Sequence, residues 1–286
     1  MTRIAYLGQP GSYSDLACRT AFPGNETLGC VSFPEVFAAA SDGRAGLALI
    51  PVDNSLAGRI ADVHHLLPEA DLHIFGEHFQ RIEHHLLAPP GATLETIRTV
   101  KSHVQQLGQC RRWLRKMGYK PVASSDSATA AKEVAESADP SVAAISSSLA
   151  GEIYGLASLA QNIEDEAHNT TRFLVMAREA TWPMDDGRQF ITSFVFRVRS
   201  VPAALYKALG GFATNGINLT KLESYMVGGH FEAAQFYVDA EGHPEQRGMR
   251  LALEELQFFC RKDTFKMLGV YQAHPFRKET EEPSDD

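Results

Sequence analysis

Short apolar runs that each end in a polar, turn-forming loop constrain this fold more than any other feature of the sequence. The runs that alternate in this way are residues 3–7, 45–52, 97–101, 120–123 and 142–145. Helical periodicity is found between them, over residues 14–21, 33–41, 58–67, 104–117, 127–137 and 147–154. Strands that alternate with helices predict an α/β domain with mainly parallel sheets. Ligands of such sheets bind at the carboxyl ends of the strands, so the polar loops should face the site.

A different unit is predicted after residues 181–189, a polar segment that contains Pro183 and Gly187 and lacks apolar periodicity. The pattern then predicts a strand, a helix, a hairpin of two strands that turns at Gly228 and Gly229, a second helix and a last strand. These elements are residues 191–198, 202–214, 217–227, 231–238, 245–261 and 265–271. The order βαββαβ is the ferredoxin-like plan, in which helices cover one face of an antiparallel sheet.

Size and charge limit the classes of protein to consider. A chain of 286 residues is expected to form two domains. Its 27 Lys and Arg against 35 Asp and Glu give a net charge of −8, and no basic run is longer than the pair Arg111–Arg112. A nucleic-acid partner is not predicted, because phosphate binding needs a basic face. Neither a membrane span nor a signal peptide is visible, so we expect a cytoplasmic protein with no membrane partner.

Cysteine and histidine usage gives no metal signature. The cysteines form no CxxC pair and are expected to be reduced and buried; they are Cys18, Cys30, Cys110 and Cys260. The adjacent histidine pairs are His64–His65 and His84–His85. Adjacent residues point to opposite faces of a strand, or about 100° apart on a helix, so neither pair can chelate one ion alone. We therefore expect no metal site.

Two loops carry groups that can bind an anion or move a proton. The turn from Gly8 to Ser14 precedes a helix start but lacks the GxGxxG spacing and the lysine of a phosphate loop, so nucleotide binding is not predicted. It is either a structural turn or a site for a small carboxylate. In Asn169-Thr170-Thr171-Arg172-Phe173, the guanidinium can bind a carboxylate while a hydroxyl donates a proton. The alternative is an ordinary strand entry with polar caps.

These motifs occur in the same order as in a known family. The sequence resembles the bacterial prephenate dehydratases through the turn at 8–14, Ile50-Pro51-Val52-Asp53-Asn54-Ser55 with Gly58, Gly76-Glu77, Ser102-His103, Gln109-Cys110, Asp126, Tyr154-Gly155-Leu156 and Asn169 with Thr171-Arg172-Phe173. The downstream unit resembles an ACT domain through Asn215-Gly216-Ile217-Asn218-Leu219, Glu223-Ser224 and Leu268-Gly269-Val270-Tyr271. The order of so many motifs makes the resemblance specific.

The resemblance implies a two-lobed catalytic domain, like a type 2 periplasmic binding protein, followed by a ferredoxin-like βαββαβ ACT domain. The implied boundaries are a catalytic domain at 1–180 (lobes 1–77 with 163–180, and 78–162), a linker at 181–189, an ACT domain at 190–273 and an acidic tail at 274–286. The implied reaction converts prephenate to phenylpyruvate, water and carbon dioxide without a cofactor. The implied assembly is a homodimer or homotetramer.

The resemblance also implies roles for individual residues. Thr171 is the expected general acid, helped by Asn54 and Gln109, and Arg172 is expected to orient the site or meet a carboxylate. Residues expected to bind substrate are Ser12, Tyr13, Asp53, Ser55, Ser102, Asp126, Asn169 and Phe173. Simple capping remains an equal alternative for Asn54, Ser102 and Gln109.

The implied regulator is L-phenylalanine, bound through Ala203, Ala204, Leu205, Asn215, Asn218, Leu219, Glu223 and Ser224. Here the family's Gly-Ala-Leu is Ala203-Ala204-Leu205, and Glu-Ser-Arg-Pro is Glu223-Ser224-Tyr225-Met226. The loss of a glycine and of an arginine argues against unchanged phenylalanine binding. Three other functions stay open: arogenate dehydratase, a binding protein without chemistry, and a second activity on a small signalling molecule in the same site.

Overall fold

The computed structural model describes residues 2–227 and 230–279, and these form two compact units. Residues up to 59 group with 79–173, and residues 60–78 group with 174 onward. The chain passes between the units three times: after Arg59, and within the strands β5 (His73–Arg81) and β11 (Thr170–Ala177). The segment 60–78 thus groups with the C-terminal unit, whereas the sequence suggested that it belongs to the first lobe.

The first unit contains two α/β lobes. The first lobe is built from β1 (Ile4–Leu7), α1 (Tyr13–Ala21), β2 (Thr27–Cys30), α2 (Phe33–Ser41), β3 (Leu47–Asn54) and β4 (Gly58–Arg59). Strands β3 and β2 flank β1 in parallel, and β11 lies beside β3. The helices begin at serine caps, because Ser12 and Ser32 accept hydrogen bonds from the backbone N–H groups of Asp15 and Glu35.

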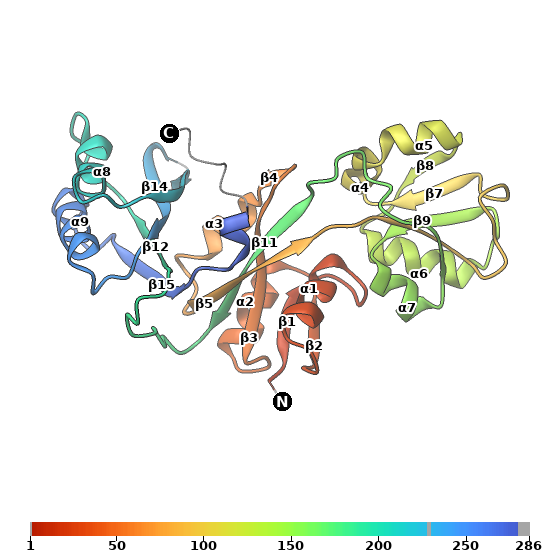
Figure 1. The fold of residues 1–286 in the computed structure, drawn as a ribbon, viewed down its shortest axis with the longest axis horizontal. Helices are drawn as coiled ribbons and strands as arrows, with labels where there is room; N and C mark the ends of the chain where they lie inside the picture. The colour runs from red at the N-terminus through yellow and green to blue at the C-terminus, as the bar shows by residue number, and fades with distance from the viewer. Residues whose placement is uncertain (1, 228–229, 280–286) are drawn as a thin grey trace. The chain divides into compact units, whose positions relative to one another are not determined.

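The second lobe has its own sheet, with the strand order β10-β6-β9-β7-β8. Its elements are β6 (His85–Ala88), β7 (Thr99–Ser102), α4 (Val104–Gln109), α5 (Arg111–Met117), β8 (Lys120–Ala123), α6 (Ser127–Ser137), β9 (Val142–Ser146), α7 (Ser148–Tyr154) and β10 (Ala157–Ala160). Helices α4 and α5 lie on one face and α6 and α7 on the other (Figure 1). The sheet is mixed, since β6 runs antiparallel to β9 and β10.

The C-terminal unit has the expected βαββαβ order. Its elements are β12 (Phe190–Phe196), α8 (Ala204–Thr214), β13 (Leu219–Val227), β14 (His230–Glu241), α9 (Arg247–Phe259) and β15 (Lys266–Gln272). The strand order β13-β14-β12-β15 is ferredoxin-like, and α8 and α9 pack on one face around Phe194, Phe212 and Leu256. The α/β fold class predicted from the sequence is therefore confirmed.

Segment 60–78 adds α3 (Ala61–Leu66) and the start of β5 to this unit. Ile74 pairs in parallel with Gly269 of β15. A Cβ on Gly269 would lie 2.2 Å from the carbonyl oxygen of Ile74, so only glycine permits this approach. His64 packs edge-on against Tyr237 at 5.5 Å. The segment is thereby attached to the sheet face opposite α8 and α9.

The structure differs locally from the sequence predictions. Residues 104–117 form two helices that break at Cys110, and 58–67 hold the short β4 and α3. The residues just after 273 form α10 (Phe276–Glu279) rather than starting a free tail. The predicted turn at Gly228 and Gly229 and the last seven residues lie outside the described residues. No helix in the described residues is long and apolar enough to cross a membrane.

Candidate active site

Asn54, at the end of β3, organises a set of polar side chains in the first unit. Its Oδ1 accepts hydrogen bonds from the backbone N–H groups of Leu56 and Ala57, at 3.1 and 2.8 Å. The amide orientation is thus set, and Nδ2 donates to Asn169 Oδ1 at 2.7 Å and to Thr171 Oγ1 at 3.0 Å. Because Thr171 Oγ1 accepts from Asn54, its own hydrogen is left to donate elsewhere, and no side chain or backbone group in the described residues accepts it.

The same set extends across to the second lobe. Asn169 Nδ2 donates to Gln109 Oε1 at 3.3 Å, and His84 Nε2 lies 2.8 Å from the same oxygen. The hydroxyl of Tyr13 contacts His84 Nδ1. We call these six residues the polar chain: Tyr13, His84, Gln109, Asn169, Asn54 and Thr171. It joins three of the predicted catalytic residues and two of the predicted substrate-binding residues.

Burial keeps the middle of the polar chain uncharged. Desolvation lowers the pKa of the His84 imidazole, which has no exposed surface, and raises the pKa of Tyr13 well above its ordinary value. A neutral His84 has one N–H, which Nε2 donates to Gln109 Oε1, so Nδ1 accepts from the Tyr13 hydroxyl. Sequence reasoning missed His84, which it considered only as half of a metal-binding pair.

The titration of His84 predicts a pH effect on stability. Burial lowers the pKa of His84 in the folded protein below 6.5, so the unfolded chain binds more protons as the pH falls through that value. The free energy of unfolding should therefore fall between about pH 7.5 and pH 5. Urea titrations should show a smaller fall for His84→Gln, because the glutamine amide can still form hydrogen bonds but does not titrate. The pKa of His85 is also lowered by burial, but wild type and variant share that group. Equal pH slopes in the two proteins would contradict this account.

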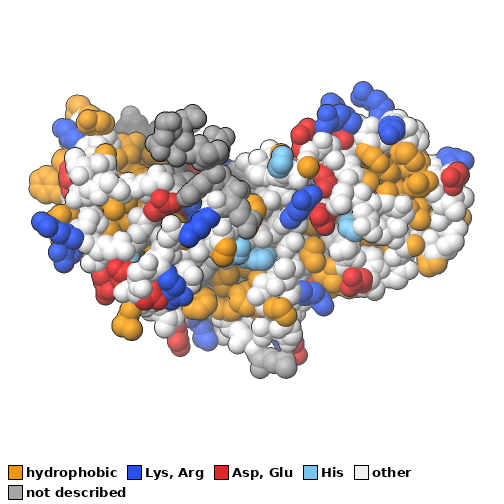
Figure 2. Space-filling model, in the orientation of Figure 1, with side chains coloured by type: hydrophobic (Ala, Val, Ile, Leu, Met, Phe, Trp, Pro, Cys, Tyr) orange, Lys and Arg blue, Asp and Glu red, His pale blue; other side chains and the backbone are white. Residues whose placement is uncertain are grey.

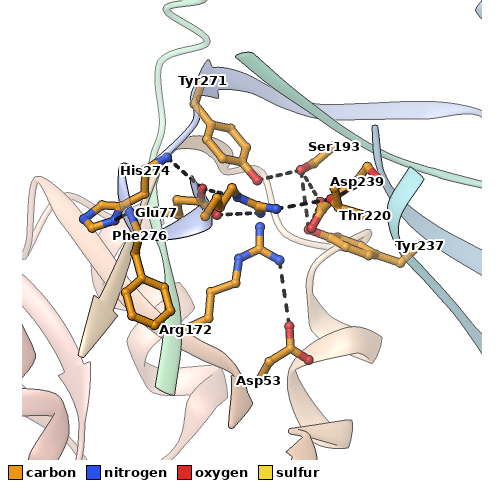
Figure 3. A network of polar contacts seen from close by, with 11 residues as sticks. Asp53, Glu77, Arg172, Ser193, Thr220, Tyr237, Asp239, Tyr271, His274 and Phe276 are labelled. Atoms are coloured by element: carbon orange, nitrogen blue, oxygen red, sulfur yellow. Dashed lines mark hydrogen bonds and ion pairs between the residues drawn. The ribbon is translucent and has the colours of Figure 1, made fainter. Parts of the chain in front are cut away.

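Arg172 lies on the other side of its strand from Thr171. Successive residues of a strand point to opposite faces, and both Thr171–Arg172 on β11 and Asn54–Asp53 on β3 are such neighbours. Thr171 pairs with Asn54, whereas Arg172 forms an ion pair with Asp53 at 3.8 Å (Figure 3). Arg172 is only 7% exposed. Arg172 therefore points away from the face that carries the Thr171 hydroxyl. This placement favours a role in orienting the site over direct contact with a substrate group that Thr171 would protonate.

The other predicted substrate-binding residues mostly contact backbone. Ser55 Oγ donates to the carbonyl of His168 at 2.6 Å and accepts from the N–H of Thr170, which fixes the start of β11. Ser102 Oγ donates to the Ile145 carbonyl and is fully buried. Asp126 caps α6. Phe173 is buried in the core.

The glycine turn before α1 binds a carboxylate of the protein itself. The Gly11 N–H donates to Asp15 Oδ2 at 2.9 Å, and Ser12 caps the helix through the N–H of Asp15. A Cβ at Gly11, where φ is +85°, would lie 2.9 Å from the Cα of Ala150, so glycine is needed for this contact with α7. The Ser147 hydroxyl donates to the Gly11 carbonyl at 2.6 Å. The turn therefore serves to hold the two lobes together.

The predicted regulatory residues lie at both ends of α8 and along β13 of the βαββαβ unit. Ala203 precedes α8 with φ +58°, a conformation that favours glycine, and Ala203, Ala204 and Leu205 line a cavity of about 480 Å³. Asn215 Nδ2 donates to the Gly211 carbonyl at the end of α8. The contacts of the remaining predicted residues are local: Asn218 with Glu241, Leu219 with the unit's core, Glu223 with Lys221, and Ser224 beside Phe236 in the sheet.

The described residues hold no group of three or more His, Cys, Asp or Glu side chains arranged to bind a metal. The donor set of the polar chain consists instead of hydroxyls, amides and one neutral imidazole. Such groups donate and accept hydrogen bonds without adding net charge, so the arrangement is suited to placing one hydroxyl proton at a defined point.

Known proteins match this fold and sequence closely. The sequence model of the family described as prephenate dehydratase matches residues 4–181. A bifunctional N-acyl-homoserine lactone acylase/prephenate dehydratase of Komagataeibacter europaeus is 50% identical over 96% of this chain and 97% of its own length. The chloroplastic arogenate dehydratase/prephenate dehydratase 1 of Arabidopsis thaliana is 38% identical over 94% of this chain and 71% of its own. The structure of prephenate dehydratase from Arthrobacter aurescens in complex with L-Phe has a TM-score of 0.85 at 27% identity, covering 95% of this chain and 90% of that one.

The fold and the site define a two-lobed α/β enzyme that acts on a small molecule. The chain belongs to the prephenate dehydratase family. Members of this family are lyases that combine dehydration with decarboxylation, and the resemblance inferred from the sequence motifs is confirmed.

Proposed function

We propose that this protein converts prephenate to phenylpyruvate, water and carbon dioxide. The observation that carries the proposal is the orientation of Thr171, whose oxygen accepts from Asn54 and whose proton remains available. Prephenate bears a carboxylate and a hydroxyl at opposite ends of one ring. Loss of both groups makes the ring aromatic, which supplies a large driving force, so the enzyme needs mainly to hold the substrate and protonate the departing hydroxyl.

In this mechanism Thr171 donates its proton as the ring C–O bond breaks, and the departing hydroxyl leaves as water. The electrons of the C–CO₂ bond enter the ring, and the carboxylate leaves as carbon dioxide. Asn54 Nδ2, at 3.0 Å, stabilises the charge that develops on Thr171 Oγ1, and solvent returns a proton afterwards. Asn169, Gln109 and His84 hold Asn54 and each other in position, since each accepts or donates a defined hydrogen bond.

The test is formation of phenylpyruvate from prephenate by the purified protein, with arogenate as a parallel substrate. We expect turnover of prephenate without added metal or cofactor. Arogenate differs by an amine in place of the keto group, and the relative from Arabidopsis carries both activities in its name. If only arogenate is turned over, the proposed mechanism stands and the substrate is arogenate instead of prephenate. Inactivity on both would refute the proposal.

We also propose that the βαββαβ unit is an ACT domain that binds L-phenylalanine and inhibits the enzyme. Two observations support this: the cavity beside Ala203 to Leu205, and the related Arthrobacter aurescens enzyme, whose structure is a complex with L-Phe. Phenylalanine added to the same assay should lower turnover and raise the melting temperature. The absence of both effects at millimolar phenylalanine would make the unit purely structural. A cytoplasmic homodimer or homotetramer remains our expectation for the assembly.

A second candidate activity is cleavage of N-acyl-homoserine lactones. The observation that favours it is the 50% identical relative from Komagataeibacter europaeus, which carries both activities in its name. Incubation with an acyl-homoserine lactone, followed by detection of the free homoserine lactone, tests it directly. A Thr171→Ala variant that loses prephenate turnover but keeps lactone cleavage would show that the two activities use different groups.

A further inference from the structure

A hollow on the second lobe has no part in the site described above. It has a volume of about 570 Å³ and lies between the helices α4 and α5 and the strand β8. It is lined by Val104, Leu107, Gly108, Arg111, Leu114, Arg115, Tyr119, Pro121 and Ala123. A volume of this size is in the range of small-molecule sites.

The floor of this hollow is apolar. Leu114 and Tyr119 belong to the buried core of the lobe, Leu107 packs against that core, and Val104 stays 61% exposed at the rim. Gly108 explains why the space is open: a Cβ there would meet no atom within 4 Å. Figure 2 shows hydrophobic side chains gathered on this lobe, with Lys and Arg side chains above them.

The rim carries positive charge that the protein does not neutralise. Arg111 and Arg115 are four residues apart and so share one face of α5. Both are exposed, and neither guanidinium group makes a hydrogen bond or ion pair within the described residues. The lining contains no Asp or Glu. Arg112, on another face, shows the contrast, since Asp165 and Glu166 neutralise it.

We propose that this hollow binds a small carboxylate with an apolar acyl or aromatic body. The apolar part would cover Leu107, Leu114 and Tyr119, and the carboxylate would pair with the guanidinium groups of Arg111 and Arg115. A guanidinium holds a carboxylate through two parallel hydrogen bonds, which gives orientation as well as attraction.

The edge of β8 argues against a peptide strand as the occupant. The N–H groups of Lys120 and Ser124 donate toward β7, to the carbonyls of Arg98 and Ser102. Backbone groups alternate in direction along a strand, so residue 121 is placed to donate to the open edge. Residue 121 is proline and has no N–H, so an added strand would lose that hydrogen bond. A small molecule needs no such donor.

Calorimetric titration with decanoate, decanol and phenylpyruvate tests the proposal and separates the two sources of carboxylate. We expect decanoate, phenylpyruvate or both to bind, and decanol to bind at least about tenfold more weakly than decanoate because it lacks the charge. Binding of decanoate alone assigns an acyl ligand. Binding of phenylpyruvate alone assigns an aromatic ligand only if the double variant Arg111→Ala/Arg115→Ala weakens it, because phenylpyruvate is also the proposed product of the catalytic site. Binding of neither carboxylate, or equal binding of decanol and decanoate, would overturn the proposal.

Variants localise the binding. The double variant Arg111→Ala/Arg115→Ala should weaken carboxylate binding at least about tenfold, whereas Lys116→Ala, on the same helix but outside the lining, should not. Gly108→Leu should fill the hollow and block binding while favouring the helix. If phenylpyruvate binds the double variant as tightly as it binds the wild type, then phenylpyruvate does not occupy this hollow. If decanoate binds both proteins equally tightly, the proposed site is refuted. Concentration-dependent sedimentation that the double variant abolishes would instead make the hollow a contact between copies of the chain.

Discussion

Replacing Thr171 with alanine should lower kcat on prephenate by about 10²–10⁴-fold and leave the fold intact. The variant removes the donated proton, and Asn54 keeps its shorter hydrogen bond to Asn169 at 2.7 Å. The melting temperature should therefore change little, since only one hydrogen bond of about 1 kcal/mol is lost. Steady-state kinetics and a thermal melt of the same preparation give both numbers.

Two further variants make this result specific. Thr171→Ser keeps the hydroxyl and should retain far more activity than Thr171→Ala. Thr170→Ala alters the neighbouring threonine, whose side chain takes no part in the polar chain, and should be close to wild type. Near-normal turnover in Thr171→Ala would remove Thr171 as the proton donor.

Replacing Arg277 with alanine should destabilise the C-terminal unit by about 3 kcal/mol, or about 10 °C in melting temperature. Glu77 on β5 has a fully buried side chain and binds Arg277 through two contacts, Oε1 to Nε at 2.6 Å and Oε2 to Nη2 at 2.8 Å. The backbone N–H of His274 donates to the same carboxylate (Figure 3). Without the guanidinium, the buried carboxylate of Glu77 loses its main partner, and leaving such a group unpaired costs more than an exposed ion pair contributes.

The ion pair of Arg188 with Asp186 offers a matched comparison. Both side chains are about half exposed, so Arg188→Ala should cost less than about 1 kcal/mol. In urea unfolding, the combined change Glu77→Leu/Arg277→Leu should recover much of the stability that Arg277→Ala loses, because no charge then remains buried. The interpretation fails if Arg277→Ala and Arg188→Ala have equal effects.

The sequence reveals regular structure where local patterns and burial agree. Apolar runs such as 45–52 and 142–145 became β3 and β9 because their residues are buried on both faces. Strand β5 was not predicted, because HIFGEHFQR mixes polar and apolar residues without clear alternation. The helix at 104–117 was predicted as one element, because the spacing of its apolar residues does not reveal the break at Cys110.

By itself, then, the sequence determined the α/β class, the βαββαβ unit and the family, and it selected Asn54, Gln109, Asn169 and Thr171 as candidate site residues, which the structure places in one hydrogen-bonded set. These depend on local periodicity and on motifs, which are properties of neighbouring residues. Only the tertiary structure decided that His84 joins the polar chain, that segment 60–78 belongs with the C-terminal unit, and that Glu77 meets Arg277 two hundred residues later. Hydrogen bonds and ion pairs between such distant residues depend on how the chain folds back on itself, and no local pattern records that.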